Sequence, residues 1–89
     1  MKAIVTVLGK DKVGIAAGVC SLLAEHGVNI LDISQTVLQG YFTMIMMVDT
    51  SGCETPFDEL AQILRERGTE RSLSVRIQRE DIFEAMHRI

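Results

Sequence analysis

The spacing of apolar and polar residues changes several times along the 89 residues of this chain. Residues 2–8 are β-branched and apolar on both faces, which predicts a strand buried in the middle of a sheet. Residues 13–26 follow a helical period instead, with Ile15 and Val19 on the apolar face. Gly27 stands where a glycine commonly ends a helix. The chain therefore begins with a predicted strand and helix.

Two further strands and then a final one are predicted from alternation and turn residues. Residues 28–39 are rich in strand-forming types, and Gly40-Tyr41 is a turn signal before a second apolar run at residues 42–49. These two runs predict a hairpin. Residues 73–78 alternate strictly between apolar and polar types, so one face of this last strand is expected to be buried and the other hydrated.

A second helix is predicted between the hairpin and the last strand. Thr55 is expected to cap it, and Pro56 suits its first helical position. Asp58 favours the positive end of the helix dipole. Gly68 is expected to end the helix.

The resulting order of elements, βαββαβ, defines the expected fold class. It is an α+β, ferredoxin-like sandwich, with a four-stranded antiparallel sheet and two helices on one face. Residues 1–79 are expected to form this domain, and residues 80–89 a short C-terminal helical extension. The extension carries apolar residues at helical spacing: Ile82, Phe83, Met86 and Ile89. Such a tail is expected to be covered, either on its own domain, on a partner chain or over a ligand pocket.

Composition and charge exclude several function classes. The net charge is −3 and the isoelectric point about 5.2, which argues against non-specific binding to nucleic acid or acidic membranes. No apolar run approaches the roughly 20 residues that span a bilayer. The cysteines, Cys20 and Cys53, form no CxxC pair, which indicates a reducing compartment without a disulfide framework. We therefore expect a soluble cytoplasmic protein.

The turn between the first strand and the first helix is the best candidate for a functional site. It contains Gly9, Asp11 and Gly14 within a stretch that joins two apolar elements. A helix that begins after such a turn leaves backbone N–H groups free, and these groups and the helix dipole favour an anion. The sequence therefore predicts a binding turn.

Two motifs carry a resemblance to a known family. Asp11-Lys12-Val13-Gly14-Ile15 lies at the first strand–helix junction, and Gly27-Val28-Asn29-Ile30 leads into the second strand. With the βαββαβ order, these motifs resemble the ACT domain, over residues 2–79. The chain is similar to single, free-standing ACT domains, to the amino-terminal ACT modules of formyltetrahydrofolate deformylase and to glycine-cleavage regulatory proteins.

The resemblance implies a regulatory module that binds a small ligand, usually an amino acid, and that pairs side by side into an eight-stranded sheet. It implies a ligand site between the first turn of one chain and the second strand of its neighbour. The implied residues are Gly9, Lys10, Asp11, Lys12, Val13, Gly14 and Ile15 on the turn, with Asn29 and Ile30 on the strand. The chain has Val13 where many ACT domains have proline, so its turn is less fixed in φ.

Each implied ligand contact has a structural alternative. Gly14 gives a ligand access to the backbone, or it allows close packing of the helix on the sheet. Asp11 holds an ammonium group, or it caps the helix. Asn29 offers a ligand both a donor and an acceptor, or it satisfies backbone groups before the strand. The backbone N–H groups near Val13 to Ile15 can bind a carboxylate.

The other reactive side chains are assigned structural roles. Cys20 is expected in the core, and His26 at the end of the first helix, where a cation suits the dipole. Three methionines in one strand, Met44, Met46 and Met47, are expected to be packing residues rather than metal ligands.

Arginines cluster late in the chain, but acidic residues are interspersed with them, so we expect a solvated surface. These arginines are Arg65, Arg67, Arg71, Arg76 and Arg79. No metal motif or cofactor motif is present, so neither group is expected.

The leading functional hypothesis is an amino-acid-binding regulatory homodimer that acts on a separate partner protein in amino-acid or one-carbon metabolism. The alternatives are an interaction module without a ligand and a small acylphosphatase-like enzyme. The enzyme is disfavoured because the first turn has Lys10 and Lys12 but no arginine. An RNA-recognition module is disfavoured because the first strand carries no aromatic residue to stack on bases.

Overall fold

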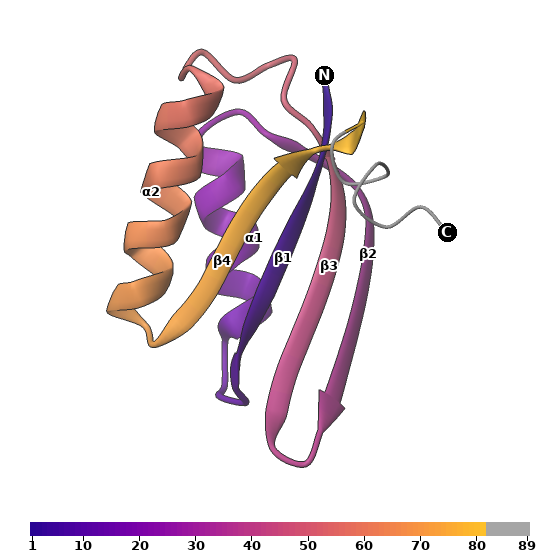
Figure 1. Ribbon diagram of the computed structural model, residues 1–89, viewed down its shortest axis with the longest axis vertical. Coiled ribbons are helices and arrows are strands. Elements are labelled where there is room, and N and C mark those ends of the chain that lie inside the picture. Colours follow the sequence, from indigo (N-terminus) through magenta and orange to yellow (C-terminus); the bar gives the residue numbers. More distant parts are fainter. Residues whose placement is uncertain (82–89) are drawn as a thin grey trace.

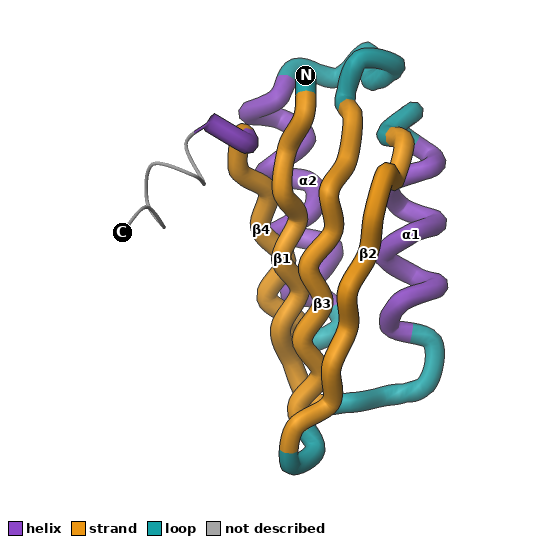
Figure 2. The backbone as a smooth tube through the Cα atoms, turned by 90° about the vertical axis from the view of Figure 1, so that its right-hand side faces the viewer, coloured by secondary structure: helices purple, strands orange, loops and turns teal. Residues whose placement is uncertain are grey.

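Four antiparallel strands form one sheet in the order β2-β3-β1-β4, and two helices cover one of its faces (Figures 1 and 2). The computed structural model describes residues 1–81. The elements are β1 (Lys2–Lys10), α1 (Ile15–Glu25), β2 (Asn29–Leu38), β3 (Tyr41–Asp49), α2 (Phe57–Glu70) and β4 (Leu73–Arg79). This order confirms the predicted ferredoxin-like fold. The expected C-terminal helix falls largely on residues 82–89, outside the described residues, so it stays a prediction.

The hydrophobic core lies between the sheet and the helices. In β4 the apolar residues of the predicted alternation, Leu73, Val75 and Ile77, are buried on this side. Met44 and Met46 of β3 are fully buried there as well, while Met47 lies half-buried on the other face. Met44 and Met46 are therefore packing residues, as predicted.

β1 is central, but it is not buried along both faces as the sequence indicated. Ala3, Val5 and Val7 are fully buried against the helices, and Ile4 is 7% exposed on the opposite face. Leu8, also on that face, is 50% exposed. The prediction is wrong at Leu8 because no second layer of residues 1–81 covers this end of the open face.

The hairpin turn lies one residue earlier than predicted. Leu38 pairs with Tyr41, so the two-residue loop is Gln39-Gly40, and Tyr41 is the first residue of β3. Both loop residues have positive φ, 49° and 82°. Positive φ at both central positions is what a hairpin with right-handed strand twist requires.

The ends of α2 differ from the prediction. Pro56, not Thr55, occupies the N-cap position, and no side chain of residues 1–81 caps the helix. Gly68 lies inside α2, which continues to Glu70. A Cβ on Gly68 would lie 2.6 Å from Cγ2 of Val75, so the glycine lets the helix approach β4 closely. Asp58 lies in the first turn of α2, as predicted.

Candidate functional site

The predicted binding turn begins later in the chain than expected, because β1 extends to Lys10. Gly9 is therefore a strand residue that pairs with Phe42 and Leu73. A Cβ on Gly9 would lie 2.5 Å from Cδ2 of Leu73, so the role of this glycine is to admit the Leu73 side chain. The turn itself consists of residues 11–14, all of them exposed.

Gly14 forms the junction between the turn and α1. It is the N-cap residue with a left-handed backbone, φ 85°, and an added Cβ would meet no atom within 4 Å. The close-packing alternative is therefore wrong, and glycine is favoured here by its backbone conformation. The space beside it is open. The capping alternative for Asp11 is also wrong, because no side chain of residues 1–81 caps α1.

The N-terminus of α1 presents free donors to this open space. Gly18 N–H donates to the carbonyl of Gly14 at 2.9 Å, which is the first hydrogen bond of the helix. The N–H groups of residues 15–17 precede it and therefore have no partner within the helix. The first turn of α1 holds no acidic residue, and exposed Lys10 and Lys12 lie just before it. The local electrostatics favour an anionic group.

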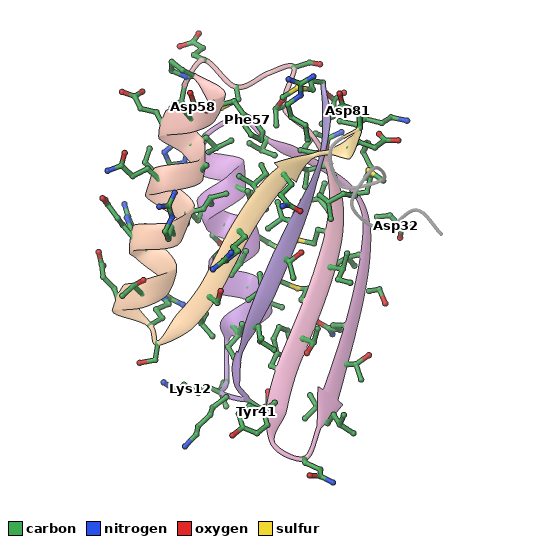
Figure 3. All side chains as sticks on the ribbon, in the orientation of Figure 1. Lys12, Asp32, Tyr41, Phe57, Asp58 and Asp81 are labelled. Atoms are coloured by element: carbon green, nitrogen blue, oxygen red, sulfur yellow. The ribbon has the colours of Figure 1, made fainter. Side chains whose placement is uncertain are left out.

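The turn is joined to the β2–β3 hairpin of the same chain. Asp11 N–H donates to the carbonyl of Gly40 at 2.8 Å. Lys12 and Tyr41 accordingly lie at the same end of the molecule (Figure 3). The C-terminal end of β2 therefore lies beside the candidate turn.

The second half of the predicted site lies at the opposite end of the sheet. Asn29 pairs with Asp49, whereas Lys10, which precedes the turn, pairs with Tyr41 at the other end of β3. The nine residue steps from Asn29 to Leu38 correspond to roughly 30 Å of strand. Asn29 is exposed, and its side chain forms no hydrogen bond with residues 1–81. Ile30 is half-buried opposite Val48. Within one chain, the two groups of predicted site residues therefore lie at opposite ends of the sheet.

His26 and the cysteines have structural environments. His26 is the C-cap residue of α1, and its Nδ1 lies 2.9 Å from the carbonyl of Leu22, as the capping prediction requires. Gly27 follows with φ 73°, in the predicted helix-ending role. Cys20 and Cys53 are free thiols, half-buried against the core. Among residues 1–81, no three histidine, cysteine or acidic side chains are placed to share a metal ion.

Among residues 1–81, Asp49 is the acidic group whose pKa is clearly shifted, and the sequence patterns did not single it out. Its Oδ1 accepts hydrogen bonds from the hydroxyl of Ser51 at 2.6 Å and from the Ser51 backbone N–H at 3.0 Å. The N-terminal ammonium lies 3.3 Å away. These hydrogen bonds, with a smaller contribution from the ammonium charge, lower the pKa of Asp49 from 3.8 to about 2.

The lowered pKa of Asp49 predicts an acid-dependent contribution to stability. A folded-state pKa below the unfolded one stabilises the fold above about pH 4, and this contribution is lost as the pH falls through about 2. We expect an NMR titration of the Asp49 carboxyl carbon to give a midpoint near 2. Ser51→Ala removes the hydroxyl hydrogen bond that lowers this pKa most and should raise the midpoint, whereas Ser72→Ala should leave the midpoint unchanged. An unshifted midpoint near 3.8 in the unsubstituted protein would contradict the assignment.

None of the helices in the described part of the chain is long and apolar enough to span a membrane.

The element order and strand order define a ferredoxin-like α+β domain, and sequence comparison gives the family. The chain belongs to the ACT domain family, whose profile matches residues 2–78. The ACT domain is a small-molecule-binding regulatory fold. The chain is 56% identical, over all 89 residues and the whole of the relative, to a UPF0237 protein of Clostridium acetobutylicum. The resemblance read from the two motifs is thereby confirmed.

Solved structures show the same similarity. An ACT domain protein from Streptococcus pneumoniae is 49% identical, with a TM-score of 0.84 and 98% of each chain covered. A formyltetrahydrofolate deformylase from Pseudomonas syringae pv. tomato is 25% identical, with a TM-score of 0.78. That match covers 88% of this chain and 27% of the deformylase.

Proposed function

We propose that this protein is an amino-acid-binding regulatory module that works as a homodimer and acts on a separate protein of amino-acid or one-carbon metabolism, without catalytic activity of its own. The observation that carries the proposal is the separation of the two halves of the site. The glycine turn and Asn29 lie at opposite ends of one sheet. A second copy that pairs along β2 can bring them together.

β2 has the features of a strand that pairs with another chain. It is an edge strand of ten residues with one charged side chain, Asp32. Ile33 and Val37 lie on the same side of the sheet as the core, yet they are 43% and 53% exposed. The other edge, β4, carries Arg76 and Arg79, and charged edge residues discourage pairing. The structure therefore favours β2 as the interface.

Two-fold pairing of β2 with its copy reverses one strand relative to the other. Asn29 of one chain then lies toward the end of β2 in the second chain, near Leu38. That end is linked to the second chain's turn through the hydrogen bond between Asp11 and Gly40. Each dimer therefore has two equivalent sites, each with a turn from one chain and Asn29 from the other.

The groups that would meet in such a site match an amino acid. The free N–H groups at the start of α1 bind the carboxylate. The exposed carboxylate of Asp11 binds the ammonium group, and the Asn29 amide supplies a donor and an acceptor. The open space beside Gly14 gives the ligand access to the backbone.

A thermal-shift screen against the common amino acids, with light scattering for mass, tests this proposal. An amino acid at one thousand times its dissociation constant should stabilise the fold by roughly 4 kcal/mol. Because the site is complete only in the dimer, the same ligand should also lower the dimer dissociation constant. A folded dimer that responds to no amino acid would support the interaction-module alternative. A monomer at all concentrations would refute the shared site.

A further inference from the structure

A groove between α1 and α2 is formed by residues of one chain alone. The two helices lie side by side on the same face of the sheet (Figure 1). The groove has a volume of about 160 Å³, and its floor is apolar: Val19, Leu22, Leu73 and Val75. These four side chains offer an apolar surface to a short hydrocarbon chain.

Two arginines that have no partner among residues 1–81 lie at the rim of this groove. Arg67 and Arg71 are four residues apart at the end of α2, and both line the groove. Neither guanidinium forms an ion pair or a hydrogen bond with residues 1–81, and both side chains are exposed. Glu70 also lines the groove, so the three rim groups carry a net charge of +1. An unpaired guanidinium over an apolar floor is suited to a carboxylate with a hydrocarbon tail.

Gly18 gives a second, independent indication. It lies inside α1, where glycine is less favourable than alanine. The three atoms nearest to a Cβ built on Gly18 all belong to the Arg71 guanidinium, and Nη1 would collide with it. A long arginine side chain can move away, so the fold itself would accept alanine. Glycine at this position therefore serves to seat the Arg71 guanidinium against α1 at the groove.

We propose that this groove binds a small aliphatic monocarboxylate. The carboxylate pairs with Arg71 and Arg67, and the short hydrocarbon tail contacts the apolar floor. Glu70 repels a second negative charge on the ligand, so phosphate and dicarboxylates are disfavoured. Every contributing group comes from a single chain, and the site is therefore independent of dimer formation.

Isovalerate is a suitable probe, titrated into ¹⁵N-labelled protein at constant ionic strength. We expect saturable shifts of the Gly18 and Gly68 amide signals with a dissociation constant on the order of 1 mM. Arg71→Ala should weaken binding at least about tenfold, because a charge-assisted hydrogen bond is lost. Arg65→Ala is the matched control and should bind normally, since Arg65 is on α2 but lines a different surface pocket.

Gly18→Ala separates a binding role from a structural one. We expect this variant to melt at a higher temperature than the unsubstituted protein, because alanine favours the helix, and to lose isovalerate binding. A lower melting temperature would show that Gly18 is required for packing and would overturn the argument from it. Equal shifts with the neutral isovaleramide, equal binding of inorganic phosphate, or binding unchanged in Arg71→Ala would each overturn the proposed site.

Discussion

Replacing Ile33 and Val37 together with lysine is expected to convert the proposed homodimer into a folded monomer. Both side chains lie on the helix side of the edge strand β2, and both are about half exposed in the single chain. Lysine at these positions therefore removes little of the core. In the proposed dimer, the double substitution removes four apolar side chains from the β2–β2 interface and places like charges near one another across the two-fold axis.

The expected effect on association is large. A loss of about 1 kcal/mol for each of four partly buried side chains amounts to about 4 kcal/mol, or a thousandfold weaker dimer. Light scattering at several concentrations measures the mass, and circular dichroism checks the fold. Ser74→Lys places the same charge on the opposite edge strand and should leave the dimer intact. A dimeric double variant would show that the interface lies elsewhere on the molecule.

The fold was predictable because its signals are local and repeated. The strict alternation in residues 73–78 and the helical period after Ile15 each record which face of an element is buried. Gly27 marked the end of α1 correctly, since a left-handed residue at that position requires no knowledge of distant contacts. The order of elements then follows from these local patterns.

The errors concern residues whose role depends on distant neighbours. Gly68 resembles a helix terminator in sequence, but its position is explained by Val75, which approaches it from β4. Gly9 resembles a turn residue in sequence, but it lies in β1 and leaves room for the Leu73 side chain of β4. Thr55 is a good capping residue by type, yet the helix begins after Pro56. In each case the sequence shows the residue type without the contact that selects it.

The candidate site was partly predictable for the same reason. The free helix N-terminus after Gly14 follows from local sequence, and the structure has it. The placement of Asn29 at the far end of the sheet depends on strand order and register, which no local pattern contains. The groove beside Gly18 was not anticipated, since Arg71 reaches α1 from a part of the chain that was predicted to be simply a solvated surface.

Mixing two variants that each fail to bind an amino acid is expected to restore amino-acid binding. Asp11→Ala removes a group from the turn half of each site, and Asn29→Ala removes one from the strand half. Both residues are exposed, Asp11 does not cap α1, and the Asn29 side chain makes no hydrogen bond with residues 1–81, so neither change should unfold the chain. Each homodimer lacks a complete site. A heterodimer carries both changes in one site and leaves the other site intact.

An equal mixture that exchanges subunits freely should contain about half heterodimers, and hence about a quarter of the sites of the unsubstituted protein. Calorimetric titration with the amino acid that gives the largest thermal shift measures this number. The intact sites should keep the affinity of the unsubstituted protein, because all their contacts are present. The double variant Asp11→Ala/Asn29→Ala, mixed with Asp11→Ala, is the matched control and should bind nothing, because every pairing then lacks Asp11. If the two single variants fail to complement each other although their subunits exchange, the turn and Asn29 do not form a shared site across the two chains.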